Sequence, residues 1–196
     1  MWSHDELNRV QLDLLDRGVI EIGGKVEGKT ALYVREALLR LVARGSPPIT
    51  ISICSEGGLV EVGLDIYDAF QVYPGKKIGL VVGYARSMAA VVLQACTQRI
   101  ASRHAQLLIH HVSRREISLD VIQDAKRLAA LKTSMEASQD RLYRILAARS
   151  GKSVAAIRRE CKKGQDMTAE EALEFGLVDM VIDSQLDLSS APKEGE

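Results

Sequence analysis

Three short apolar runs, each followed by glycine and then by a helical pattern, constrain the fold of this chain most strongly. The runs cover residues 19–22, 49–54 and 77–82, and the glycines that follow are Gly23-Gly24, Gly57-Gly58 and Gly83. Short apolar runs that alternate with amphipathic stretches are typical of parallel strands joined by helices. The sequence therefore predicts an α/β fold in which helices cover a mostly parallel sheet.

The longest pattern is a helical stretch from residue 118 to about 149, which contains neither glycine nor proline. One apolar stripe around Leu128 and another around Leu146 are separated by the mostly polar segment 132–140. Periodicity alone leaves two alternatives open for this stretch, an ordinary surface helix and an element that mediates assembly.

Length and charge narrow the class of protein. The 196 residues are 46% hydrophobic and 27% charged, and Lys plus Arg equals Asp plus Glu at 26 each. These values fit one globular domain over residues 1–186, with a polar tail at 187–196 that is expected to be disordered. The balanced charge predicts no nucleic-acid partner.

The chain shows no targeting or membrane pattern. The first residues lack the cationic and apolar regions of a signal peptide, and the most apolar window, 78–96, contains Arg86, Ser87 and Gln94. The cysteines are odd in number and widely spaced, which argues against a disulfide framework, and no metal-ligand spacing links them to histidines. We expect an intracellular, cytoplasmic protein without a metal.

Ser87 is the first candidate for chemistry, because it stands between a strand pattern and an apolar helix pattern. A hydroxyl at such a corner is held rigidly beside the N–H groups of the helix, which favour the negative charge that develops in acyl transfer. The alternative is that Ser87 only caps the helix.

His110 follows the apolar run 107–109 and is a candidate general base, with His111 as its neighbouring alternative. The Gly57-Gly58 pair could form an oxyanion hole or a peptide-docking edge.

Four segments, taken together, resemble the proteolytic subunits of the Clp protease, the ClpP family. The family's Ser-x-Gly-Gly corner appears at 53–58, its Gly-x-Ala-x-Ser-Met nucleophile turn at 83–89, its Ile-His segment at 109–110, and its closing Ala-x-Glu-Ala segment at 168–179. The resemblance extends from about residue 18 to 183.

The resemblance implies a ClpP/crotonase-like fold of repeated β-β-α units, with the stretch 118–149 as the handle helix between two stacked rings. It implies a serine endopeptidase that cleaves unfolded polypeptides inside an oligomeric chamber, a double heptamer, fed by a AAA+ unfoldase and needing no cofactor. Ser87 would be the nucleophile and His110 the base. The backbone N–H groups of Gly57 or Gly58 and of Met88 would stabilise the oxyanion.

The sequence departs from the family pattern at the third member of the triad. Gly164 stands in the position of the orienting Asp, and the nearest carboxylate is Asp166, which we predict to complete the triad. The alternative is that Asp166 is an exposed loop residue. Glu56 also replaces a Pro before the Gly-Gly pair, the segment between His110 and residue 168 is about five residues longer, and the N-terminus looks short of the loops that contact the unfoldase.

Two other functions remain open at this stage. The missing Asp suggests a catalytically silent structural subunit that forms mixed rings with an active paralogue. An acyl-CoA enzyme of the crotonase type would share the fold and the backbone oxyanion hole, but it needs no nucleophilic serine.

Overall fold

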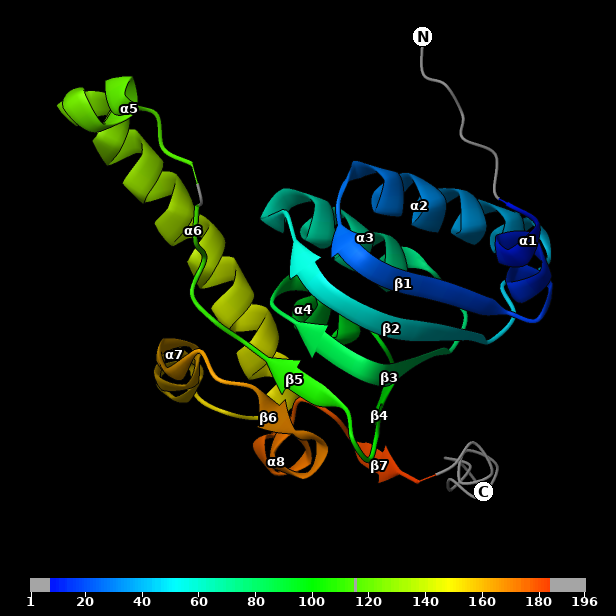
Figure 1. Ribbon diagram of the computed structural model, residues 1–196. Helices are drawn as coiled ribbons and strands as arrows, with labels where there is room; N and C mark the ends of the chain where they lie inside the picture. Colours follow the sequence, from blue (N-terminus) through cyan, green and yellow to red (C-terminus); the bar gives the residue numbers. More distant parts are fainter. Residues whose placement is uncertain (1–7, 115, 184–196) are drawn as a thin grey trace, which may run out of the picture.

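The computed structural model describes residues 8–114 and 116–183, and its centre is a twisted sheet (Figure 1). Parallel strands follow one another in the order β1-β2-β3-β4-β7, while β5 pairs with the end of β3 and β6 runs antiparallel to β5. The strands are β1 (Val19–Val26), β2 (Ile49–Gly58), β3 (Lys77–Arg86), β4 (Gln98–Ser102), β5 (Gln106–Leu108), β6 (Met167–Thr168) and β7 (Met180–Ile182).

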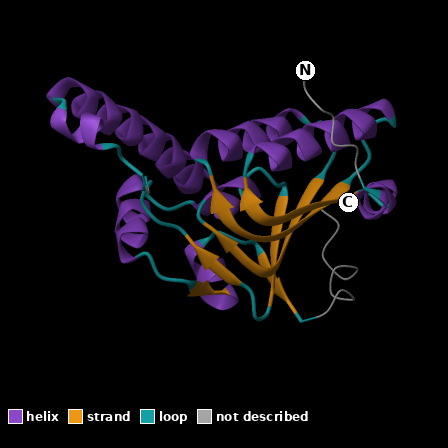
Figure 2. Cartoon of the chain, turned by 45° about the horizontal axis from the view of Figure 1, so that its top comes forward, coloured by secondary structure: helices purple, strands orange, loops and turns teal. Residues whose placement is uncertain are grey.

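Helices separate most of the strands along the chain, and Figures 1 and 2 show α2 and α3 lying over one face of the sheet. This arrangement confirms the predicted α/β fold. The helices are α1 (Arg9–Asp16), α2 (Gly28–Ala43), α3 (Val60–Val72), α4 (Met88–Leu93), α5 (Leu119–Gln123), α6 (Ala125–Ser150), α7 (Val154–Lys163) and α8 (Ala169–Phe175). The short helix α1 had no counterpart in the sequence-based prediction.

The core lies between the sheet and these helices. In β2 every second residue is buried, so Ile49, Ile51 and Ile53 face the helices while the residues between them are half-buried. Full burial of one such side chain is worth roughly 1.5–3 kcal/mol. The main cluster of buried apolar side chains draws on residues from Leu15 to Val178.

The strands run further than the apolar runs predicted. We expected β1 to stop at Ile22, but it continues through Gly23 and Gly24 and pairs with β2 as far as Val26. Strand β3 likewise passes through Gly83 and ends at Arg86. Main-chain pairing holds these glycine-containing segments in the sheet although they contribute little apolar burial. As a result, Ser87 follows directly after the strand.

The long helical stretch contains a break that the absence of Gly and Pro did not predict. It forms α5 and α6, and Asp124 lies between them in an extended conformation. The Asp124 carboxylate accepts hydrogen bonds from the N–H groups of Lys126 and Arg127 at 2.9 and 3.1 Å. An aspartate that caps a new helix in this way competes with continuation of the previous one.

Helix α6 extends away from the sheet, with α5 folded against its far end (Figure 1). The two predicted stripes behave differently. Leu142 and Leu146, where α6 meets the sheet, are buried in the core, whereas Ile122 of α5 and Leu128 at the far end of α6 are 51% and 41% exposed. The far stripe is therefore uncovered in the single chain.

The last elements largely follow the sequence. Thr168 and Glu171 form a capping box at the start of α8, and Gly176 ends that helix in a left-handed conformation. Between Cys161 and Thr168, α7 continues to Lys163 and the short strand β6 precedes α8. The predicted tail at 187–196 lies outside the described residues. Among the helices of the described ranges, none is long and apolar enough to span a membrane.

Candidate active site

Ser87 occupies a strained corner between β3 and α4. Its backbone has φ 54° and ψ −123°, and its N–H donates to the carbonyl of Leu108 at 2.8 Å. A non-glycine residue in such a region costs of the order of 1–3 kcal/mol, and such strain is concentrated at functional sites. Although Ser87 stands at the N-cap, its side chain makes no capping hydrogen bond. Capping therefore does not account for this serine.

Gly57 packs directly under this corner. Its φ is +83°, and a Cβ atom placed on it would lie 2.6 Å from the Arg86 carbonyl oxygen, 2.8 Å from the Met88 nitrogen and 2.8 Å from the Ser87 Cβ. Only glycine allows β2 to approach the nucleophile turn so closely. The predicted Gly-Gly corner and the predicted serine turn, about thirty residues apart in sequence, are thus in contact.

The candidate oxyanion donors lie around the same corner. The Gly57 N–H donates to Ser55 Oγ at 3.1 Å, and the Ser55 hydroxyl donates to the Gly24 carbonyl at 2.5 Å, so the Gly57 donor is already engaged. Gly58 lines the pocket beside Ser87. Met88 is the first residue of α4, where the helix offers its own N–H groups no partner. Gly58 and Met88 thus both lie next to Ser87.

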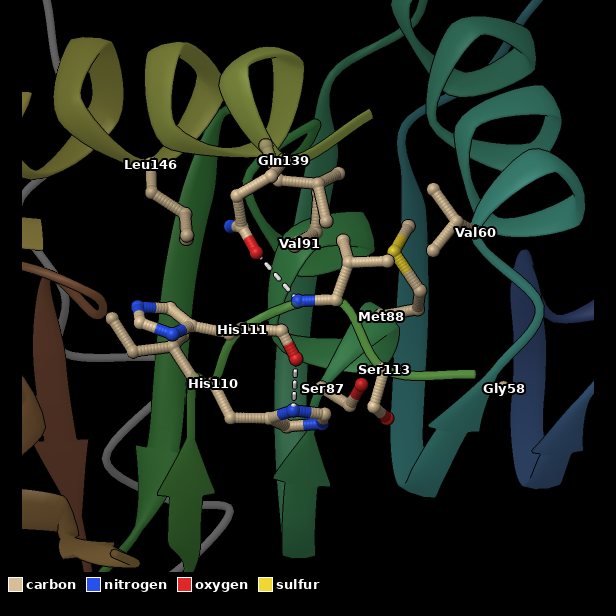
Figure 3. A pocket seen from close by; sticks show the side chains of 13 residues that line it. Gly58, Val60, Ser87, Met88, Val91, His110, His111, Ser113, Gln139 and Leu146 are labelled. Atoms are coloured by element: carbon tan, nitrogen blue, oxygen red, sulfur yellow. Dashed lines mark hydrogen bonds between the residues drawn. The ribbon is translucent and has the colours of Figure 1, made fainter. Parts of the chain in front are cut away.

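His110 lies in the loop after β5, which ends at Leu108, one residue earlier than we expected. Its ring lies beside Ser87 in the pocket (Figure 3). The ring nitrogen Nδ1 lies 2.6 Å from the carbonyl oxygen of His111. His111 points the other way, with its ring 6.1 Å from that of Tyr143 in an edge-to-face contact. Only His110 is placed to act on Ser87, although the two histidines are adjacent.

An apolar wall completes the pocket, formed by Val60 of α3, Val91 of α4, and Leu142 and Leu146 of α6. Gln139 of α6 also lines the pocket, and its Oε1 accepts a hydrogen bond from the Val112 N–H (Figure 3). The sequence-based prediction did not identify Gln139. It lies in the polar segment 132–140, and no sequence signal distinguished it from the solvated residues around it.

Asp166 lies apart from this pocket. Its carboxylate accepts hydrogen bonds from Arg86 Nε at 2.6 Å and from Arg86 Nη2 at 2.9 Å. The hydrogen bonds that Arg86 donates to this carboxylate raise the pKa of Arg86. Within the described residues, the only hydrogen bond of the His110 ring is the one to the His111 carbonyl. The structure does not bring Asp166, the predicted third member of the triad, to His110.

Gly164, which stands where the family carries its Asp, ends α7 with φ +58° and has open space around it. No carboxylate is contributed from this position. In the described part of the chain, no group of three or more His, Cys, Asp or Glu residues could hold a metal ion.

The strained Ser87 corner, the Gly57 contact and the His110 loop each fall in a segment for which the sequence resembles the ClpP family. The sequence matches the Clp protease family over residues 3–185. ATP-dependent Clp protease proteolytic subunit 3 of Synechococcus sp. (strain CC9605) is 36% identical over 171 residues, covering 84% of this chain and 82% of that protein.

Two further relatives are similar over an even larger share of the chain. ATP-dependent Clp protease proteolytic subunit 3 of Streptomyces coelicolor is 32% identical over 189 residues, which cover 94% of this chain and 84% of that protein. The ATP-dependent Clp protease proteolytic subunit of Porphyromonas gingivalis is 31% identical over 186 residues, with coverages of 91% and 81%. The chain belongs to the Clp protease family.

Proposed function

We propose that this chain is a serine endopeptidase subunit, with Ser87 as the nucleophile and His110 as the general base. The observation that carries the proposal is the strained conformation of Ser87 at the corner between β3 and α4. Its hydroxyl makes no capping hydrogen bond to the helix and lies in one pocket with the imidazole of His110. The membership in the Clp protease family supports the same reaction class.

In the proposed acylation step, Ser87 Oγ attacks the carbonyl carbon of the scissile peptide bond, and its proton passes to His110 Nε2. The N–H groups of Gly58 and Met88 stabilise the oxyanion of the tetrahedral intermediate. His110 then gives the proton to the leaving amine as the C–N bond breaks. Water, activated by the same imidazole, hydrolyses the acyl-enzyme and regenerates Ser87.

The substrate that we propose is an unfolded polypeptide. The apolar wall of Val60, Val91, Leu142 and Leu146 beside the nucleophile suits an apolar side chain next to the scissile bond. The relatives are named as ATP-dependent, which supports a separate AAA+ unfoldase as the source of unfolded chains. Cleavage of short peptides should then need no ATP.

We further propose that the subunits form a closed ring assembly, a double heptamer. The exposed apolar side chains of α5 and the far end of α6 support this, because burying such side chains is a usual result of subunit association. Leu119 is 65% exposed and Ile122 is 51% exposed. Light scattering should give a mass about fourteen times that of the 21.5 kDa chain. A monomer at micromolar concentration would exclude the ring.

A catalytically silent subunit of a mixed ring is the second candidate. The observation that favours it is the pairing of Asp166 with Arg86, since no carboxylate among the described residues then contacts the His110 ring. The family match gives no support to the acyl-CoA alternative.

A fluorophosphonate probe separates the two candidates. We expect the probe to label wild-type protein at Ser87, and we expect Ser87→Ala to remove both labelling and peptide hydrolysis. Ser113→Ala is the matched control, because Ser113 is exposed and lines the same pocket (Figure 3). Labelling at Ser113, or unchanged hydrolysis by Ser87→Ala, would refute the assignment. An assembled protein that neither labels nor hydrolyses would be a silent subunit.

A further inference from the structure

One peptide group near the base has both of its polar atoms engaged by side chains. The carbonyl oxygen of His111 contacts His110 Nδ1 at 2.6 Å, and the N–H of Val112, which points the opposite way within the same planar peptide unit, donates to Gln139 Oε1 (Figure 3). A trans peptide unit is planar, so fixing its N–H also fixes the direction of its C=O. Gln139 of α6 therefore fixes the direction of the His111 carbonyl, which contacts the His110 ring.

The chemistry of this contact defines the state of the base. A carbonyl oxygen can only accept a hydrogen bond, so Nδ1 of His110 carries the proton and Nε2 of the neutral ring keeps its lone pair. A base that is to take a proton from Ser87 requires this tautomer. In a complete triad a carboxylate selects it.

The hydrogen bond from the Val112 N–H fixes the orientation of the Gln139 side-chain amide. If the amide were reversed, its NH₂ group would face the Val112 N–H, and two donors would meet. In the observed orientation, Nε2 is buried and has no hydrogen-bond partner among the described residues. An unsatisfied buried donor costs roughly 1–3 kcal/mol. An apolar side chain would fill the space at position 139 without leaving a buried donor unsatisfied. A packing role alone therefore does not explain the glutamine.

The side chain of His111 makes further contacts that hold the same segment. The His111 ring packs edge-to-face on Tyr143 of α6, and its Nε2 lies 3.4 Å from the carbonyl of Arg158 in α7. The peptide group after His111 is thus held between α6 and α7. These contacts restrict the orientation of the loop that carries His110.

We propose that the peptide group between His111 and Val112, fixed by Gln139, takes the place of the orienting carboxylate in this site. Gln139 is then a positioning residue that acts on His110 through the main chain. The inference rests on the proposed serine-peptidase function and names how the base is held.

The test compares variants of Gln139 in the assembled protein. Gln139→Met keeps the length of the side chain and removes the accepting oxygen, while Gln139→Glu keeps an accepting oxygen. Gln71→Met is the matched control, because Gln71 is exposed near the C-terminal end of α3, whereas the pocket residue Val60 lies at the other end of that helix. The readouts are kcat and KM for a short peptide and the rate of fluorophosphonate labelling, measured on the fraction that has wild-type size and melting temperature.

We expect Gln139→Met to lower kcat and the labelling rate about ten- to a hundredfold with little change in KM, since misplacement of a catalytic group by about 1 Å costs on this order. Gln139→Glu should recover most of the rate, and Gln71→Met should match wild type. Should Gln139→Met fail to assemble, Gln139→Ala and Gln139→Glu make the same comparison.

The outcomes separate the two proposals. Wild-type protein that labels, together with an assembled Gln139→Met or Gln139→Ala that labels equally fast, overturns the role of Gln139 alone. That role is also overturned if Gln139→Glu loses as much activity as Gln139→Met. Wild-type protein that does not label at all overturns the proposed function, and the inference with it.

Discussion

Replacing Gly57 by alanine tests whether the contact between β2 and the Ser87 corner holds the nucleophile in place. The new Cβ would lie 2.6 Å from the Arg86 carbonyl oxygen and 2.8 Å from the Ser87 Cβ, well inside van der Waals contact. Both neighbours belong to the turn that carries the nucleophile, so the turn itself must move. We therefore expect Gly57→Ala to affect catalysis and stability together.

The expected loss of stability in Gly57→Ala has two parts. An L residue at the left-handed φ of +83° costs about 1–2 kcal/mol, and overpacking adds about 1–3 kcal/mol. Gly45→Ala is the matched control, because Gly45 has φ +87° but nothing within 4 Å of its Cβ. It carries the conformational cost of about 1–2 kcal/mol alone.

Thermal melting and fluorophosphonate labelling read the two effects separately. Each kcal/mol lowers the melting temperature by about 2–4 °C in a domain of this size. Displacement of the nucleophile turn should slow labelling about a hundredfold or more, whereas Gly45→Ala should label like wild type. A folded Gly57→Ala protein that labels at the wild-type rate would refute the argument that this close approach positions Ser87.

Three further results are expected. Asp166→Asn should leave peptide hydrolysis near the wild-type rate, because its carboxylate is in a partly exposed ion pair, worth about 0–1 kcal/mol; a loss greater than about tenfold would restore its predicted triad role. Cys96 should resist iodoacetamide at pH 8 in the folded protein, because burial raises its pKa from 9.0 to about 12 and thereby lowers its thiolate fraction about a thousandfold; rapid alkylation would contradict this. Burial alone would raise the pKa of Asp179, but hydrogen bonds from Arg99 outweigh it and lower that pKa. This stabilisation is present above the unfolded pKa near 3.8 and disappears as pH falls through the lower folded value, so Arg99→Gln should make acid unfolding less steep.

Periodicity and glycine positions were sufficient to predict the fold class and most of the elements. They worked for β2, where alternate isoleucines face the core, and for α8, where a capping box and a glycine define both ends. They misplaced strand ends, because β1 and β3 are extended past their apolar runs by main-chain pairing that no side chain signals. The break at Asp124 was missed for a similar reason, since an aspartate is compatible with a helix until its carboxylate caps a new one.

The candidate site was predictable only where local sequence determines geometry. The corner at Ser87 follows from a strand, a turn and a helix that are consecutive, and the structure places His110 beside it. The hydrogen-bond partner of His110, by contrast, is determined by tertiary structure. Asp166 was chosen because it is the nearest acid in sequence, whereas Arg86 engages it in space. Gln139 reaches the site from a helix whose surrounding residues are polar and solvated.

The way the base is held has a consequence for the rate of the proposed reaction. In a complete triad, changing the orienting Asp to Asn costs about 10⁴-fold in kcat, because the imidazole then adopts the wrong tautomer. A main-chain carbonyl avoids this loss, since it can only accept the Nδ1 proton of His110. It carries a dipole and not a full charge, so it stabilises the imidazolium formed during acylation less than a carboxylate would. The expected rate therefore falls between that of a complete triad and that of its Asn variant.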